Sequence, residues 1–159
     1  MPMESGSFSP DLMERLLLDV MLGKLATLLR MCGFDAAYAL DREIEADDEI
    51  LTLAESEGRL VITRDRELAA RAEKSILLES KDVDDQLREL GEEGMELILD
   101  EPSRCAACNN SLELVSASGE TPEYAPDLDE QPVWRCRDCD QHFWKGSHWD
   151  DVEARLTRF

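Results

Sequence analysis

Apolar residues along this chain occur in two patterns, as short unbroken runs and as segments with helical spacing. Arg15–Asp19 is a short apolar run that ends in an acidic residue, and it predicts a buried strand. In the next segment, Val20–Met31, apolar side chains recur three or four positions apart, which predicts a helix with one buried face. Gly33 follows this segment and predicts a left-handed cap at the end of the helix.

The same alternation continues to about residue 99. Asp47 is the predicted N-cap of a second helix, and Gly58 is predicted to end it. Strands are predicted at Asp35–Leu40, Leu60–Thr63, Ile76–Leu78 and Met95–Leu99, and helices at Asp47–Glu57, at Glu67–Glu73, and from Asp82 or Asp84 to Leu90. Strands that alternate with helices are joined by right-handed crossovers. The predicted fold class is therefore α/β, with a mostly parallel sheet flanked by helices.

Four of the five cysteines stand in two pairs with the same spacing, Cys105 with Cys108 and Cys136 with Cys139. Each pair can place two thiolates on one metal ion, and two pairs complete the tetrahedral four-sulfur site that zinc prefers. Two disulfides or a redox dithiol are the alternatives. The shared spacing and the absence of a secretory signal pattern favour a zinc ribbon. The fifth cysteine, Cys32, lies in the apolar helical pattern and is expected in the core.

Changes in composition suggest how the chain is divided. We expect a disordered tail at residues 1–13, an α/β domain at 14–101, the zinc ribbon at 102–149 and a C-terminal segment at 150–159. Pro102 and Ser103 mark the boundary before the ribbon. Between the cysteine pairs, residues 116–132 are polar and acidic and contain three prolines, which predicts a long exposed loop.

Acidic residues stand where the predicted strands end and the predicted helices begin. Asp19 ends the first strand, Asp65 follows the strand that ends at Thr63, and Asp47 begins a helix. In an open parallel sheet the carboxyl ends of the strands form the edge where active sites lie. Carboxylates that converge there, with Glu67 as a fourth, favour magnesium or manganese, which prefer oxygen ligands. The alternative is that Asp47 and Asp65 only cap their helices.

Several motifs occur in the order in which one known family has them. They are LLDVMLGKLA at 17–26, LR at 29–30, GFD at 33–35, DDEI at 47–50, TRDREL at 63–68, DQL at 85–87 and WKGSHW at 144–149. With the two cysteine pairs, they resemble the PIN-like ribonuclease family named for the C-terminal domain of the Mut-seven exonuclease. The similarity extends from about Leu16 to Trp149.

The resemblance implies a PIN-like α/β fold with a C-terminal zinc ribbon. It also implies metal-dependent cleavage of RNA, with catalytic magnesium or manganese and structural zinc. Carried over by position, it makes Asp19, Asp47 and Asp65 the expected metal ligands, and Asp48 competes with Asp47 for that role. Glu67 stands where related sequences often have Asp, so it is a further candidate ligand.

Basic and aromatic residues near these motifs are candidates for contacts with RNA. Lys24, about one helical turn beyond Asp19, is expected to contact a phosphate or to neutralise developing charge, unless it is simply a solvated helix residue. Trp144 and Trp149 either stack on unpaired bases or cover the small core of the ribbon, and the second role is favoured. His148 is not expected to bind zinc, because four thiolates already complete the site.

A binding protein is the alternative to an enzyme. In that interpretation the chain is a non-catalytic RNA- or ribosome-associated factor derived from a nuclease fold. A third hypothesis is that the ribbon and its acidic loop recruit a protein partner. The sequence contains no apolar run long enough to span a membrane, and the metal-type spacing of its cysteines fits a reducing cytoplasm.

Charge is the most unusual feature of the composition. Asp and Glu number 37 against 17 Lys and Arg, a formal net charge of −20, and the acids are spread along the whole chain. This pattern is typical of proteins adapted to molar salt, where the Debye length falls to about 3 Å and self-repulsion is screened. At low salt the same charge would oppose binding to nucleic acid.

We predict that the free energy of unfolding is greater in 2 M than in 50 mM potassium chloride, because the added salt screens repulsion among the acidic side chains. Urea unfolding at the two salt concentrations measures the difference. Equal stability in both would refute the proposed adaptation to salt.

Overall fold

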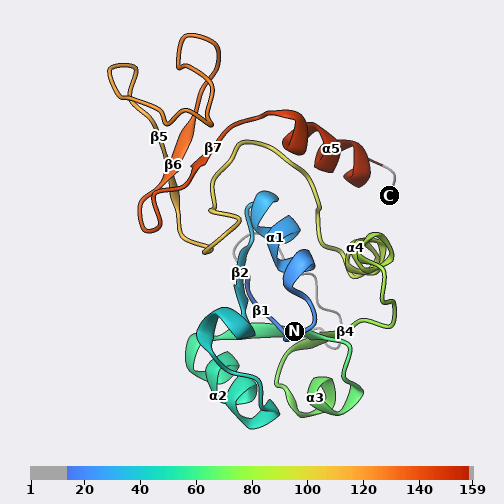
Figure 1. The fold of residues 1–159 in the computed structure, drawn as a ribbon. Helices are drawn as coiled ribbons and strands as arrows, with labels where there is room; N and C mark the ends of the chain where they lie inside the picture. Colours follow the sequence, from blue (N-terminus) through green and yellow to red (C-terminus); the bar gives the residue numbers. More distant parts are fainter. Residues whose placement is uncertain (1–13, 158–159) are drawn as a thin grey trace, which may run out of the picture.

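The computed structural model describes residues 14–157, which form an α/β body and a smaller C-terminal sheet (Figure 1). The predicted disordered tail, residues 1–13, lies outside the described residues. The body contains β1 (Arg15–Leu18), α1 (Gly23–Met31), β2 (Asp35–Tyr38), the 3-10 helix η1 (Ala39–Arg42), α2 (Asp47–Glu57), β3 (Arg59–Thr63), α3 (Arg66–Arg71), β4 (Ser75–Leu77) and α4 (Val83–Glu92). Beyond it lie β5 (Leu112–Leu114), β6 (Trp134–Cys136), β7 (His142–Phe143) and α5 (Ser147–Leu156).

The body is built on a four-stranded parallel sheet with the strand order β2-β1-β3-β4. At its centre Leu17 of β1 lies between Ala37 of β2 and Val61 of β3. Each pair of successive strands is joined through a helix, as parallel pairing requires. The α/β fold class predicted from the alternation of strands and helices is confirmed. Strands β5, β6 and β7 form a separate antiparallel sheet in the order of the sequence.

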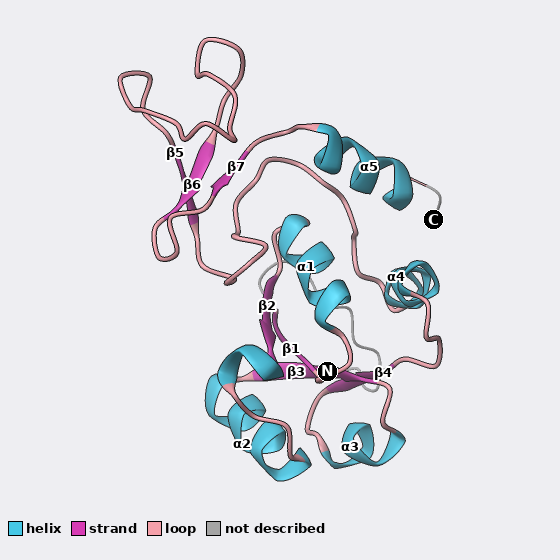
Figure 2. Ribbon diagram, in the orientation of Figure 1, coloured by secondary structure: helices cyan, strands magenta, loops and turns pink. Residues whose placement is uncertain are grey.

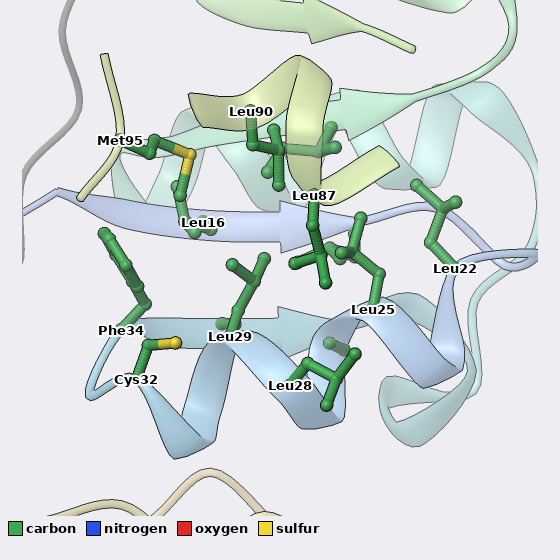
Figure 3. Packing of buried hydrophobic residues seen from close by; sticks show 14 of the residues in the cluster. Leu16, Leu22, Leu25, Leu28, Leu29, Cys32, Phe34, Leu87, Leu90 and Met95 are labelled. Carbon is green, nitrogen blue, oxygen red and sulfur yellow. The ribbon is translucent and has the colours of Figure 1, made fainter. Parts of the chain in front are cut away.

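The helices cover both faces of the parallel sheet (Figure 2). Because side chains alternate along a strand, Leu16 and Leu18 of β1 face α1, α4 and α5, whereas Leu17 faces α2 and α3. Figure 3 shows the first of these two cores, where Leu29 of α1 and Leu87 of α4 pack around Leu16. Cys32 is buried in the same core, as expected, and burial raises the pKa of its thiol to about 12.

Two predicted elements differ from the structure. Residues 95–99 form no strand. Met95 is buried beneath the end of α4, and Ile98 is 61% exposed. Backbone geometry explains the difference, because Gly94 adopts φ 97 and the Met95 N–H bonds to the carbonyl of Leu90, which turns the chain at the end of the helix. In α2, Ala46 is the N-cap, and Asp47 is the first helical residue rather than the predicted cap.

The C-terminal helix α5 packs on the body. It crosses the predicted boundary at residue 149, and Trp149, Val152 and Leu156 all lie in the core formed with α1 and α4. Because Trp149 is buried in the core of the body, the expectation that it covers the small core of the ribbon is wrong for this residue. The amphipathic spacing of α5 explains this, because its apolar side chains face the body. No helix among the described residues is long and apolar enough to cross a membrane.

The edge of the sheet at β2 is joined to the first cysteine pair. Asn109 Oδ1 accepts a hydrogen bond from the Ala36 N–H (2.9 Å), and Asn109 Nδ2 donates to Asp35 Oδ1 (2.7 Å). The Asp35 carboxylate also accepts from Arg59 (2.8 Å). Burial raises the pKa of Asp35, but the hydrogen bonds from Arg59 and Asn109, together with the positive charges of Arg59 and Arg104, outweigh burial and hold that pKa below its usual value.

Arg30 of α1 makes a second connection at the same junction. Its guanidinium is buried, with a residue exposure of 3%. It donates to the carbonyl of Ala36 in β2 (2.8 Å) and to the carbonyls of Ala106 (3.0 Å) and Ala107 (3.3 Å) in the first cysteine pair. A buried charge needs several such partners to offset its lost hydration. The body and the cysteine segment are therefore held together by polar contacts that only this docked arrangement satisfies.

We predict that Asn109→Ala destabilises the protein more than Asp140→Ala. Both residues follow a cysteine pair and have positive φ, 73 and 66 respectively. An alanine is therefore strained to a similar extent at either position. Asn109 bonds to β2 of the parallel sheet, whereas the Asp140 side chain forms an exposed ion pair with Arg135 of β6 (2.6 Å). Two partly buried hydrogen bonds, one of them to a carboxylate, are worth about 1–3 kcal/mol. Urea unfolding measures both variants, and an equal loss in the two would show that the junction adds no stability.

Candidate active site and metal centre

Asp19 lies at the carboxyl end of β1 and is only 5% exposed. One of its carboxylate oxygens accepts a hydrogen bond from the Val20 N–H (2.7 Å), and the other accepts from the Thr63 hydroxyl (2.6 Å). The chain turns directly afterwards, since the Leu22 N–H bonds to the Asp19 carbonyl (3.0 Å). Both oxygens are thus held in fixed directions at the edge of the sheet.

Thr63 connects Asp19 to Asp65. Its hydroxyl donates to Asp19 and accepts a hydrogen bond from the main-chain N–H of Asp65 (2.9 Å). Asp65 Oδ1 in turn accepts from the N–H groups of Glu67 (2.9 Å) and Leu68 (3.2 Å), so Asp65 is the N-cap of α3. Within the described residues its second oxygen has no hydrogen-bond partner. Capping and ligand binding are therefore compatible roles for this side chain.

The structure distinguishes Asp47 from Asp48. Partial burial, followed by the negative charges of Asp65 and Asp19, raises the pKa of the Asp47 carboxyl. Asp48 instead pairs with Arg71 (2.5 Å) and has a side chain that is 83% exposed. Asp47 therefore lies within electrostatic reach of Asp65 and Asp19, whereas Asp48 is exposed and paired with Arg71.

Glu67 belongs to the same electrostatic environment. It contributes to the raised pKa of Asp47, and Arg71 opposes that effect. The side chains predicted to converge at the carboxyl edge of the sheet thus lie near enough to influence one another. They are less tightly gathered than the cysteines, because among the described residues only the four cysteines bring three or more ligand atoms within 4.8 Å of one another.

The acidic edge offers donors of the kind that a hard divalent cation takes. Its donors are all carboxylate oxygens, which magnesium and manganese prefer. Like charges that raise the pKa of Asp47 are unfavourable in the metal-free protein, and a cation between them would remove that repulsion. Asp19, Asp47 and Asp65 are the side chains that would hold it, with Glu67 beside them.

Two supporting residues were not identified from the sequence. Thr63 is fully buried and organises both Asp19 and Asp65. Tyr38 donates its hydroxyl proton to the carbonyl of Val20 (2.5 Å) and packs against Gly23, where an added Cβ would lie 3.0 Å from the tyrosine oxygen. The one signal available for Thr63 was a hydroxyl residue at the end of a strand, two positions before an acid. No local signal indicated Tyr38.

Two basic residues stand close to these acids in the sequence. Lys24 is exposed in the first turn of α1, directly after the turn that contains Asp19. Arg64 follows Thr63, and its guanidinium rests against the sulfur of Met21 (3.7 Å). The Nε of Arg64 is buried and has no hydrogen-bond partner among the described residues.

The four predicted zinc ligands are brought together. Cys105 Sγ lies 3.6 Å from Cys139 Sγ, and Cys108 Sγ lies 3.4 Å from Cys136 Sγ. No disulfide links these cysteines. In a tetrahedral zinc site with bonds of about 2.3 Å, the sulfurs are about 3.8 Å apart, close to the separations here. The geometry fits zinc, and the predicted zinc ribbon is compatible with the structure.

The two cysteine pairs share one backbone geometry. In each, the residue after the second cysteine has positive φ and donates its N–H to the carbonyl of the first, from Asn109 to Cys105 (2.8 Å) and from Asp140 to Cys136 (3.2 Å). N–H groups also point at the sulfurs, including that of Cys108 toward Cys105 (3.4 Å). Such donors stabilise thiolates and orient them toward a shared metal ion.

A family model described as the Mut7-C RNAse domain matches residues 14–156 of the chain. The match includes the parallel sheet, the acidic edge, the cysteine cluster and all of α5. No curated protein and no solved structure matches the chain.

We predict that Asp47→Asn weakens manganese binding at least about tenfold, whereas Asp48→Asn leaves it within about twofold. Without metal, Asp47→Asn should also raise the unfolding midpoint at pH 7. An aspartate whose pKa is raised by folding destabilises the protein above that pKa, and this effect disappears below the usual aspartate pKa. The gain should therefore vanish in acid.

Titration calorimetry and urea unfolding measure the two effects. Asp48→Asn is a matched control of the same chemistry one position away, and it removes only an exposed ion pair. Equal effects of the two variants on manganese affinity would contradict the assignment of Asp47.

Proposed function

Because the chain belongs to the Mut7-C RNAse domain family, we propose that it is a metal-dependent ribonuclease whose active site is the acidic edge of the parallel sheet. The observation that carries this proposal is the Thr63 hydroxyl between Asp19 and Asp65. It holds the Asp19 carboxylate and the main chain of Asp65 together at neighbouring strand ends. The raised pKa of Asp47 supports a third acid near them. The reaction is hydrolysis of an RNA phosphodiester.

Asp19, Asp47 and Asp65 would hold magnesium or manganese, with Glu67 as an additional ligand or as a contact to bound water. When bound, such an ion lowers the pKa of coordinated water and neutralises charge that develops on the phosphoryl oxygens. Asp19 is the most rigid of the three carboxylates, because both of its oxygens accept hydrogen bonds and its side chain is buried. This rigidity orients the site before substrate arrives.

Lys24 and Arg64 are the residues that we assign to the phosphate backbone. Lys24 is on the first turn of α1, and its flexible ammonium group can reach a phosphate or a leaving oxygen near Asp19. Arg64 directly precedes Asp65 in the sequence, and its Nε has no hydrogen-bond partner among the described residues. Both side chains supply positive charge to an edge that otherwise repels a polyanion.

The alternative is a non-catalytic factor that binds RNA, the ribosome or another protein through the cysteine ribbon. It requires the same fold but gives no role to the Thr63 arrangement. In a pure binding protein, removal of the Asp19 carboxylate has no catalytic consequence. Substitution of Asp19 therefore distinguishes an enzyme from a binding factor.

We predict that Asp19→Asn and Asp65→Asn abolish single-turnover cleavage of a labelled mixed RNA pool in manganese. Thr63→Val, which removes only the support for these ligands, should slow cleavage by about 10- to 100-fold, as expected for a group that orients a metal ligand. Gel analysis of end-labelled products measures the rates. Asp129→Asn, in the distant acidic loop, is the control for a lost negative charge.

Retained RNA affinity and unchanged circular dichroism spectra would establish that the variants are folded. Cleavage at the same rate in wild type and both Asp variants would place the activity elsewhere. No cleavage by the wild type under these conditions, with RNA bound, would favour the binding factor.

A further inference from the structure

A cavity lies between the cysteine ribbon and the body, away from the acidic edge. It has a volume of about 250 Å³ and is lined from β7 and the start of α5 by Phe143, Trp144, His148 and Trp149. Met31, at the end of α1, lines the cavity from the body. The cavity contains both histidines of the chain and two of its three tryptophans.

The charge of this cavity differs from that of the rest of the molecule. None of its lining residues is acidic, although 37 of the 159 residues of the chain are Asp or Glu. Three other cavities along the described part of the chain are each lined by two acids, Glu92 and Glu153, Glu55 and Glu73, or Asp48 and Glu49. Arg104 lines the aromatic cavity, and Lys145 Nζ lies 5.8 Å from the centre of the Trp149 ring. This combination is complementary to an anionic ligand with an aromatic group.

We propose that this cavity binds an unpaired base of an RNA strand whose backbone leads to the acidic edge. The proposal rests on the ribonuclease function and specifies its substrate as single-stranded RNA. Pockets for drug-sized molecules usually measure about 300–1,000 Å³, so a cavity of 250 Å³ suits one planar base. Aromatic side chains stack on any base, and the basic groups at the rim contact the adjoining phosphates.

The exposed ring of Tyr124 extends the aromatic surface. It belongs to the long loop between the cysteine pairs and is 58% exposed. Its ring lies 6.0 Å from that of Trp144 at an angle of 35°, and its hydroxyl accepts a hydrogen bond from the His142 N–H (3.0 Å). The loop thus places a second aromatic ring beside Trp144, which lines the cavity.

Helix α1 sets the spacing between the cavity and the acidic edge. The turn after Asp19 leads into the helix, and Met31 at its other end lines the cavity. Nine helical residues extend about 14 Å. A few nucleotides of RNA therefore extend from the stacked base to the carboxylates. The cavity would thus fix how many nucleotides separate the bound base from the phosphodiester that is cut.

The test is fluorescence anisotropy of a labelled ten-nucleotide unpaired RNA and of an RNA duplex of equal length, without magnesium or manganese. Wild type should bind the single strand more tightly than the duplex. Trp144→Ala should weaken single-strand binding about tenfold and leave duplex binding unchanged. Trp144→Phe should retain most of the affinity. Leu114→Ala is the control, because Leu114 is 61% exposed on the ribbon and does not line the cavity.

Photo-crosslinking of a 4-thiouridine RNA to the wild-type protein provides a second measurement that needs no variant. Crosslinks should map to residues 142–149 or to Tyr124. Unchanged affinity of Trp144→Ala, an equal loss for the duplex, or crosslinks confined to other segments would each overturn the proposal. Cleavage that needs Asp19 but not Trp144 would overturn the base site alone. Single-strand binding through Trp144 without cleavage in manganese would overturn the ribonuclease function alone.

Discussion

The rest of the candidate site depends on the carboxylate of Asp19, which is buried at the end of β1. A buried carboxylate is costly unless hydrogen bonds replace its lost hydration. Here those bonds come from the Val20 N–H and the Thr63 hydroxyl. The Thr63 bond forms only if β1 and β3 pair in their observed register, and the same hydroxyl positions Asp65 at the start of α3. One polar contact in the core thus links the pairing of the central strands to the geometry of the acids.

The sequence predicted the features that depend on local pattern. The apolar runs located β1, β3 and β4 to within a residue or two, and Gly58 ended α2 as expected, with φ 65. The spacing of the two cysteine pairs predicted that the four thiolates come together, because this spacing is typical of ligands that share one metal ion. Asp19 and Asp65 could be placed at one edge because the carboxyl ends of parallel strands necessarily meet there.

Features that depend on tertiary contacts were not predictable in the same way. Asp47 and Asp48 are adjacent and chemically identical, and only the orientation of α2 and the position of Arg71 distinguish them. The apolar stretch at 95–99 has strand-like composition, but the turn at Gly94 ends α4 there and no strand of the sheet pairs with it. Arg30 and Asn109 looked like ordinary polar residues, yet both bond to the outward-facing groups of Ala36. These contacts make the cysteine ribbon part of the structure of the body, and the aromatic cavity lies beside the junction that they form.

The central claim is that the acidic edge acts on RNA phosphates through a divalent metal ion. Sulfur substitution at the scissile phosphate tests it most directly, because magnesium binds sulfur poorly, whereas the softer manganese tolerates it. The measurement is the single-turnover cleavage rate of each phosphorothioate stereoisomer in magnesium and then in manganese. We expect at least one stereoisomer to be cleaved slowly in magnesium and to recover in manganese, with no recovery in Asp19→Asn. Unchanged rates for both stereoisomers in magnesium would contradict the account.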